Sequence, residues 1–172
     1  MKFYKIIFLI TFILGLSVPS LYAGSQDKKS FNKAMAYYSQ QRYDLAEKEL
    51  TKAIEINPAN FEAMYFLGNI YHYKEDFEQA VIYYDKSIFI NPQYIKAYYN
   101  RGLSLASIGK LNQAILNFDR AIELDPGYSK SYHARGNIYL ADGQEDKGFA
   151  DLDKAVALEK DNPEFYFSRG IA

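Results

Sequence analysis

The sequence predicts an all-α protein, an α-α superhelix (solenoid) of antiparallel helix hairpins stacked along the chain. Three observations predict it. One pattern of residues recurs every 34 positions, its apolar members follow the three- and four-residue spacing of a helix face, and Pro or Gly separates the segments. A single hairpin of this size cannot bury its apolar face alone, so neighbouring hairpins have to stack.

The glycines show the repeat most directly. Gly68, Gly102, Gly136 and Gly170 follow one another at intervals of 34 residues, and Ala34 has the same phase in a more divergent first copy. No insertion or deletion interrupts this register. It gives four full units, at residues 27–60, 61–94, 95–128 and 129–162, and a partial fifth at 163–172.

The second helix expected in each unit carries an apolar stripe that alternates small and large residues. Such a stripe lets two helices approach closely. Its small members are Ala46, Ala80, Ala114 and Gly148, and its large members are Leu50, Tyr84, Phe118 and Leu152. The turns within hairpins are expected at residues 75–76, 109–110 and 142–143. The turns between hairpins are expected at Pro58, Pro92 and Pro126.

The C-terminal part of the array departs from the pattern. Glu145 stands where the other units have a large side chain, and Lys160 stands where they have Pro, so we expect weaker packing of this second helix. A terminal helix of an array normally has a polar outer face, which Phe165, Tyr166, Phe167 and Ile171 do not provide. Either the array is a shortened version of a longer one, or this end docks on a partner. Self-association as a homo-oligomer through the partial repeat is a further alternative.

The first 23 residues have the features of an export signal. Lys2 and Lys5 precede an apolar run at residues 6–18, and Ala23 is a suitable last residue before cleavage. The run is short for a membrane-spanning helix, which needs about 20 residues. We therefore expect a signal peptide at 1–23, a polar leader at 24–26, and a periplasmic or secreted protein. An association with the membrane is expected only if the signal segment stays uncleaved.

The 34-residue pattern resembles the tetratricopeptide repeat family over residues 27–172. The resemblance implies helix pairs wound into a right-handed superhelix whose concave groove is lined by the first helices. Tyr offers a rigid ring with a hydroxyl group and is suited to holding an extended peptide. The peptide-binding groove residues expected here are Tyr65, Asn69, His72, Lys96, Tyr99, Asn100, Lys130, His133 and Asn137.

Some members of this family bind a C-terminal carboxylate through a clamp of lysines, asparagines and an arginine. Asn69, Asn100 and Lys130 match that clamp, whereas Tyr65 and Ala134 stand where the family has Lys and Arg. Two of the cationic donors that give such a site its strength are therefore missing. The asparagines can also serve a groove by bonding to a peptide backbone, and we favour this interpretation.

A second pattern links acidic and basic residues sixteen positions apart. Arg appears on a first helix only where the preceding unit has Asp at the linked position, and the first such pair of positions holds Thr51 and Leu67 instead. Because a lone charge in a buried seam is costly, this coupling predicts a ladder of salt bridges between repeats. Chance drift among duplicated units is the alternative. The expected pairs are Asp85 with Arg101, Asp119 with Arg135, and Asp153 with Arg169.

Composition and motifs limit the function. The net charge of −1 argues against nucleic-acid binding through bulk charge, and the absence of cysteine excludes disulfides and thiolate metal sites. His72 and His133 are the only histidines and lie on non-adjacent units, so no metal site is expected. No catalytic motif and no cofactor-binding loop are visible. We therefore expect a non-catalytic scaffold or adaptor of the bacterial cell envelope that binds a protein or peptide. The alternative is an accessory subunit of an envelope peptidase, a peptidoglycan enzyme or a secretion system.

Overall fold

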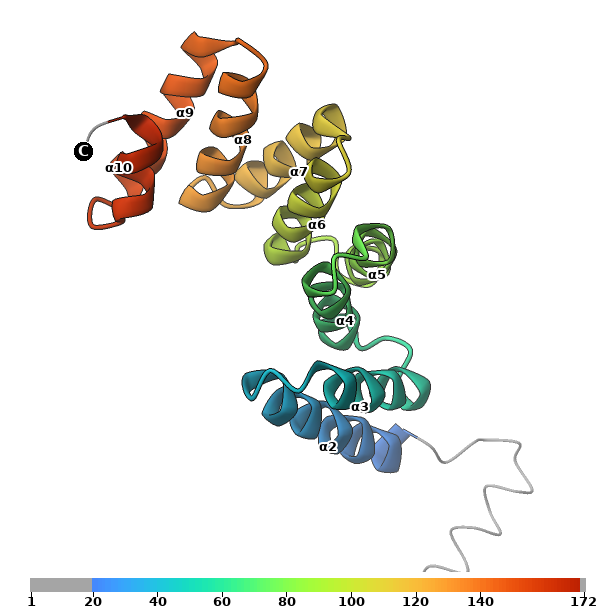
Figure 1. Cartoon of the computed structure of the whole chain (residues 1–172). Helices are drawn as coiled ribbons and strands as arrows, with labels where there is room; N and C mark the ends of the chain where they lie inside the picture. The colour runs from blue at the N-terminus through green and yellow to red at the C-terminus, as the bar shows by residue number, and fades with distance from the viewer. Residues whose placement is uncertain (1–19, 171–172) are drawn as a thin grey trace, which may run out of the picture. The chain divides into compact units, whose positions relative to one another are not determined.

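The computed structural model describes residues 20–170, and every regular element in that range is an α-helix (Figure 1). The all-α solenoid class predicted from the 34-residue pattern is thereby confirmed. The helices pair as hairpins, followed by one short helix. They are α2 (Ser20–Ser39), α3 (Tyr43–Ile56), α4 (Phe61–Tyr73), α5 (Phe77–Ile90), α6 (Ile95–Ser107), α7 (Leu111–Leu124), α8 (Ser129–Ala141), α9 (Glu145–Leu158) and α10 (Pro163–Arg169).

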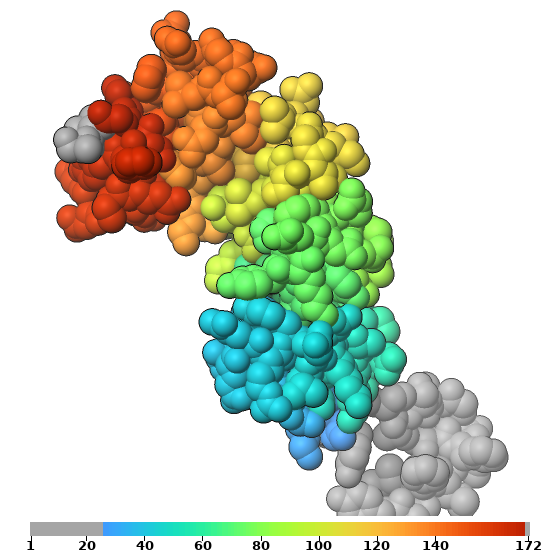
Figure 2. Space-filling model, viewed as in Figure 1, coloured from blue at the N-terminus to red at the C-terminus, as the bar shows by residue number. Residues whose placement is uncertain are grey.

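The chain forms two compact units that divide between Ala63 and Met64. In the first unit α2 and α3 pack on each other through Ala34, Ala46 and Leu50, all fully buried. In the second unit α5 packs on α6, α7 on α8 and α9 on α10, so each second helix also contacts the next hairpin. Successive hairpins of this unit adjoin one another from green to red in Figure 2. Stacking of this kind gives each hairpin of the second unit a neighbour that covers its apolar face.

The turn inside each hairpin has the same backbone geometry. One residue per turn has a positive φ, at intervals of 34 residues, and these residues are Gln41, Glu75, Gly109 and Gly143. In the third unit the amide of Lys110 donates to the carbonyl of Leu105 at 2.9 Å, a bond that closes the end of a helix over a left-handed residue. Glycine adopts this conformation without strain, whereas Gln41 and Glu75 do so at a cost.

The turns between hairpins use short polar side chains. Asn57, Asn91 and Asp125 each accept a hydrogen bond from the backbone amide two residues later, at 2.8–3.1 Å. This local bond stabilises the turn between the hairpins, in which a proline directly follows each of the three residues. At the fourth such position Glu159 has a longer side chain, and it instead accepts a hydrogen bond from the hydroxyl of Ser129.

Close approach within the second and third hairpins depends on the phased glycines. A Cβ atom at Gly68 would lie 2.5 Å from Cε1 of Tyr84, and one at Gly102 would lie 2.6 Å from Cε1 of Phe118. Both aromatic rings are almost fully buried. The ring of the second helix therefore fills the space where the first helix has no side chain. Gly170 differs from them, because it ends α10 with a φ of 76° and has no neighbouring atom at its Cβ position.

The fourth hairpin replaces this arrangement with another. Gly148 takes the place of the phased alanine, and a Cβ atom there would lie 2.5 Å from Cδ2 of Leu140. Leu140 thus occupies the space that the missing methyl group leaves, and α9 has the same 14 residues as α5 and α7. Glu145 begins α9 at an exposed position, where its charge costs no burial. The weaker packing expected for α9 stays a prediction about its stability.

The partial fifth repeat is less apolar on its surface than its sequence suggests. Phe165 is 1% exposed and belongs to the core, Tyr166 is half-buried, and Phe167 is 80% exposed. Ile171 lies outside the described residues. One of the four apolar residues at this end therefore packs inward, and Phe167 is the clear exception that faces solvent.

Most of the export segment expected at 1–23 lies outside the described residues, and its cleavage stays a prediction. The residues expected as a polar leader, 24–26, fall within α2. Among the residues that the structure describes, no helix has the length and apolar character needed to cross a membrane.

Candidate functional site

Three helices of the second unit are joined by a network of amide and phenol groups. The Oδ1 atom of Asn69 on α4 accepts hydrogen bonds from the Tyr84 hydroxyl at 2.8 Å and from Nδ2 of Asn100 at 2.7 Å. The same Nδ2 atom lies 3.1 Å from the hydroxyl of Tyr65. The network fixes both asparagines in one orientation, because Oδ1 of Asn69 accepts two hydrogen bonds and Nδ2 of Asn100 donates to two acceptors.

The network leaves hydrogen-bonding capacity on both asparagines. In the described part of the chain, Nδ2 of Asn69 and Oδ1 of Asn100 make no hydrogen bond, and both side chains are partly exposed. One group is a donor and the other is an acceptor, and they belong to side chains in direct contact. A peptide unit also offers one donor and one acceptor, so this pair can bind an extended backbone.

Tyrosine rings line the first helices in a repeated arrangement. The rings of Tyr65 and Tyr94 meet edge to face at 5.0 Å, and those of Tyr99 and Tyr128 do so at 5.5 Å. Both members of the second pair lie 34 residues after those of the first. In each pair, one tyrosine comes from a first helix and the other precedes the next first helix. Edge-to-face pairs of this kind are favourable and hold the rings rigidly.

Burial raises the pKa values of these phenol groups further above neutral pH. It raises the pKa of Tyr128 to about 12, with further contributions from Tyr99, Tyr65, Glu159 and Asp125. Burial also raises the pKa values of Tyr65 and Tyr99. The mutual contributions place the three phenols in one neighbourhood. At neutral pH they are therefore neutral hydrogen-bond donors rather than charged groups.

The two histidines expected in the groove are bonded within the protein. His72 Nδ1 lies 2.8 Å from the hydroxyl of Ser104, and His133 Nε2 lies 2.7 Å from the hydroxyl of Ser168. The His133 ring also packs 4.7 Å from Phe165. Burial lowers the pKa of both histidines. In the described residues, no group of three or more potential metal ligands converges.

The remaining expected groove residues are exposed, and one of them has an acidic neighbour. Lys96, Lys130 and Asn137 are all solvent-exposed. Hydrogen bonds from Ser129 and Asn162 lower the pKa of the Glu159 carboxyl, and the charge of Lys130 makes a smaller contribution in the same direction. Of the three residues that match a carboxylate clamp, the structure thus joins Asn69 to Asn100, while Lys130 is solvent-exposed on α8.

The structure brings together all three acid–base pairs expected sixteen residues apart. Arg101 pairs with Asp85, Arg135 with Asp119, and Arg169 with Asp153. Each pair joins the second helix of one hairpin to the first helix of the next. Their contribution to stability stays a prediction, because geometry alone does not measure the coupling energy.

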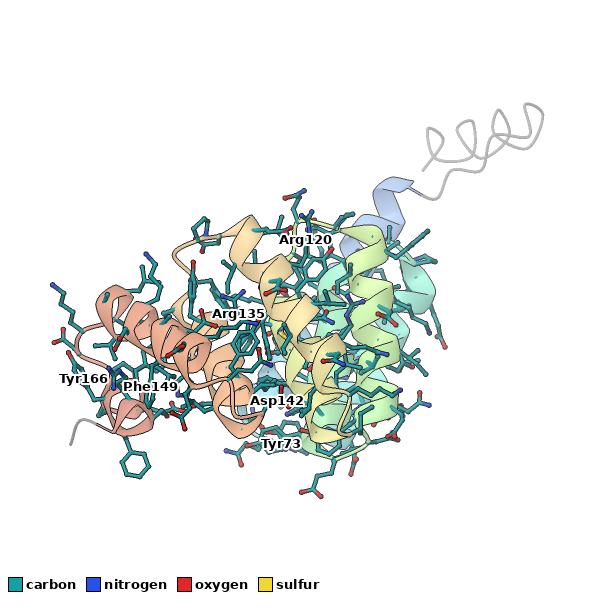
Figure 3. The ribbon with its side chains drawn as sticks, turned by 90° about the horizontal axis from the view of Figure 1, so that it is seen from above. Tyr73, Arg120, Arg135, Asp142, Phe149 and Tyr166 are labelled. Atoms are coloured by element: carbon teal, nitrogen blue, oxygen red, sulfur yellow. The ribbon has the colours of Figure 1, made fainter. Side chains whose placement is uncertain are left out.

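Each arginine of the first two pairs has a second partner. Nε of Arg101 donates to Oδ1 of Asn117 at 2.7 Å, and Nε and Nη2 of Arg135 donate to Asp151 at 2.7 and 2.8 Å. Figure 3 labels Arg135 among the side chains between the hairpins. Asp151 is 8% exposed, and hydrogen bonds to Asp151 and Asp119 raise the pKa of Arg135. Arg135 is therefore held at the centre of a three-residue ion network.

Family comparisons agree with this architecture. Sequence models described as Tetratricopeptide repeat match residues 31–95, 95–128 and 117–149, which together cover more than half of the chain. This chain belongs to the tetratricopeptide repeat family. No curated protein matches it.

Solved structures share the tetratricopeptide fold with this chain. The crystal structure of MamA has a TM-score of 0.75 at 24% identity, covering 80% of this chain and 81% of that chain. A thermophilic TPR protein of Thermus thermophilus has a TM-score of 0.71 at 25% identity, covering 83% and 79%. The first TPR of Spaghetti (RPAP3), bound to the HSP90 peptide SRMEEVD, has a TM-score of 0.67 at 24% identity, covering 69% and 94%.

The family assignment fixes the broad class of function. Tetratricopeptide domains bind protein or peptide partners, and proteins of this family are generally non-catalytic scaffolds. The chain is accordingly a protein-interaction scaffold.

Sequence reasoning missed the second partners of the ladder in this tetratricopeptide chain. The 34-residue phase of Asp85, Asp119 and Asp153 predicts pairing between units and argues against pairing within a unit. The structure pairs these three acids between units and adds a partner that the pattern did not include, since Arg135 also binds Asp151 of its own unit. The repeat contains a signal for these partners. Asn117 and Asp151 occupy the position that Glu49 has in the first unit, and Arg101 and Arg135 occupy the position of Lys33. In the first unit Lys33 binds Glu49 at 2.5 Å.

Proposed function

We propose that this tetratricopeptide chain is an adaptor of the bacterial cell envelope that holds an extended peptide segment of a partner protein. The segment binds to the surface formed by Tyr65, Asn69, Tyr99, Asn100 and Tyr128, called here the first-helix surface. The observation that carries the proposal is the unused donor and acceptor on the touching pair Asn69 and Asn100.

Neutral groups dominate the chemistry of the first-helix surface. The hydroxyls of Tyr99 and Tyr128 make no hydrogen bond to the described residues and are protonated donors at neutral pH, since burial raises their pKa values further above the ordinary one. Carbonyl oxygens of an extended chain are suitable acceptors for such groups, and the rings offer apolar area to its side chains. Binding through backbone groups tolerates several peptide sequences, which suits an adaptor.

A C-terminal carboxylate is a poorer ligand for this surface. Burial raises the pKa of Tyr99 and lowers that of His133, and the Glu164 carboxylate adds to the first shift and opposes the second. The charge of Lys130 contributes to the lowered pKa of Glu159, after hydrogen bonds from Ser129 and Asn162. These carboxylates repel an anionic ligand at the side of the surface nearest α10. The proposal therefore commits to an internal segment of the partner rather than to its free C-terminus.

The envelope location rests on the N-terminal sequence. The basic start, the short apolar run at residues 6–18 and the small residue at position 23 support export. Recovery of the protein from the periplasmic or secreted fraction, with Gly24 as its first residue, is the expected result. A protein that keeps Met1 in the cytoplasmic fraction would contradict this part of the proposal.

Site-specific photo-crosslinking in cells tests the binding surface. A photoreactive residue at exposed Lys96 or Asn137, beside the first-helix surface, is expected to capture a partner protein. The matched control carries the same residue at exposed Glu78 on α5. Capture from position 78 alone would refute the proposed surface. Mass spectrometry of the captured protein would also show whether it is a peptidase, a peptidoglycan enzyme or a secretion component.

The tyrosine hydroxyls provide a second test that does not disturb packing. The double variant Tyr99→Phe and Tyr128→Phe keeps both rings and removes two donors. Each lost hydrogen bond is worth about 0.5–1.5 kcal/mol, so the affinity for the captured peptide is expected to fall about tenfold. Calorimetric titration measures this change, and an unchanged affinity would exclude the hydroxyls as ligands of the peptide.

A further inference from the structure

A hollow of about 500 Å³ opens on the second-helix side of the array, between α5, α6 and α7. Val81 and Asp85 line it from α5, Leu116 from α7, and Tyr98 and Leu105 from α6. The α6 residues that line the hollow and the α6 residues of the first-helix surface lie on opposite sides of that helix, because successive residues turn by about 100°. The hollow is therefore separate from the proposed peptide-binding surface.

Apolar side chains project from the helices on either side of this hollow. Phe89 on α5 is 85% exposed, Ile82 on α5 is 43% exposed, and Leu116 on α7 is 66% exposed. Phe89 also borders a smaller adjoining hollow of about 360 Å³, which shares Asp85 with the larger one. An exposed cluster of large apolar residues beside hollows is typical of a protein interface.

The corresponding place in the next repeat is filled. Tyr139 stands at the position of Leu105, and its ring lies 5.9 Å from the Arg135 guanidinium and 5.3 Å from the Lys147 amine. The smaller Leu105 leaves this volume open between α5 and α7. The residue at this position, Leu105 here and Tyr139 in the next repeat, therefore differs in size between the two hairpins.

We propose that this surface, formed by Ile82, Phe89, Leu116 and the hollow, is where two copies of the chain associate about a two-fold axis. A two-fold interface must be complementary to itself. The surface meets this requirement because it holds projecting apolar side chains and hollows side by side.

The charges at the edge of the surface also favour a second copy as the partner. Asp85 and Glu123 are acidic, Lys86 and Arg120 are basic, and all four lie on the same two helices. Asp85 pairs with Arg101 and Arg120 with Glu123 within the chain, and Asp85, Arg120 and Glu123 each keep a solvent-exposed side (53%, 42% and 64% of the side chain). Figure 3 labels Arg120 on this part of the molecule. Because the patch carries both positive and negative charges, unlike charges can face each other across a two-fold axis. A partner whose surface carries charges of a single sign would be repelled by part of the patch.

The repeat itself supplies the substitutions for a test. Phe89→Glu introduces the residue that the chain has at the equivalent positions 55 and 123, and Leu116→Lys introduces the residue that it has at position 48. Both substitutions therefore suit an exposed site on a second helix and leave the core unchanged. Phe167→Glu is the matched control, because Phe167 is 80% exposed on the partial fifth repeat.

Sedimentation equilibrium of the purified protein over a concentration series measures the association. We expect a dimer whose dissociation constant rises at least about tenfold in Phe89→Glu and in Leu116→Lys, and stays unchanged in Phe167→Glu. Circular dichroism checks that each variant keeps its helix content. A monomer at all concentrations would overturn the proposal. So would a dimer that resists both substitutions, or one that only Phe167→Glu weakens, which would place self-association at the partial repeat.

Discussion

At the scale of single residues, each side chain can be compared with the residues at the same position of the other repeats. Ser131 occupies a fully buried position on α8, where α4 has Ala63 and α6 has Ala97. Its hydroxyl is the buried side-chain group without a hydrogen-bond partner among the described residues. A buried polar group without a partner costs about 1–3 kcal/mol. The fourth unit thus carries an energetic penalty for burying an unpaired hydroxyl, and the third unit does not. In the sequence this difference is visible only as a change from Ala to Ser.

We predict that Ser131→Ala stabilises the protein by about 1 kcal/mol, because it removes an unpaired hydroxyl without leaving a cavity. Urea denaturation followed by circular dichroism measures the change. Ser129→Ala is the control, because the Ser129 hydroxyl donates to Glu159 and its loss should destabilise. If both variants shift the free energy of unfolding in the same direction, the assignment of Ser131 as unsatisfied is incorrect.

The position of a residue within the 34-residue repeat also explains which parts of the candidate surface could be predicted. The positions of Tyr65, Tyr99 and Asn100 on the first helices follow from the 34-residue register alone. The bond between Asn69 and Asn100 could not be predicted, because it depends on side-chain rotamers in two different repeats. The hollow beside Leu116 could not be predicted either, since side chains of three helices together determine its shape.

At the scale of elements, the ladder couples neighbouring hairpins with unequal strength. Arg101 binds the exposed Asp85 and the neutral Asn117, whereas Arg135 binds Asp119 and the largely buried Asp151. Removing an arginine from the first site leaves an acid that water can solvate. Removing it from the second leaves a buried carboxylate without its cation, which costs far more.

We predict that Arg135→Leu destabilises the protein by about 3–4 kcal/mol and Arg101→Leu by about 1 kcal/mol. Thermal and urea unfolding measure both. Adding Asp151→Asn to Arg135→Leu should recover most of the loss, since Asn is the residue that the third unit has at position 117. Equal costs for the two arginines would mean that the buried acid carries no penalty.

A double-mutant cycle on Asp85→Thr and Arg101→Leu isolates the first pair of the ladder. These substitutions reproduce the residue types that the chain has at positions 51 and 67. A coupling energy of about 0.5–1 kcal/mol is expected for a pair this exposed. Purely additive changes would show that the ladder is a by-product of duplication rather than a link between hairpins.

At the scale of the whole molecule, helix α6 separates the proposed peptide-binding surface from the proposed association surface. Helix α6 presents Tyr99 and Asn100 on one side and Tyr98 and Leu105 on the other. A helix that is shared between a peptide surface and an association surface can serve both at once, because neither partner covers the other's residues. Dimerisation would then place two peptide-binding surfaces in one particle and raise the avidity for a partner that carries repeated segments.

The last prediction is that the two surfaces act independently. Phe89→Glu should abolish the dimer while each chain keeps its affinity for the peptide, measured by calorimetric titration. The Tyr99→Phe and Tyr128→Phe double variant should weaken peptide binding about tenfold while the sedimentation of the protein stays unchanged. The avidity for a partner with several segments should fall in both variants, in one through the loss of valence and in the other through the loss of intrinsic affinity. If Phe89→Glu also weakens the binding of a single peptide, the two sides of α6 are coupled, and the peptide-binding surface extends across the contact between the copies.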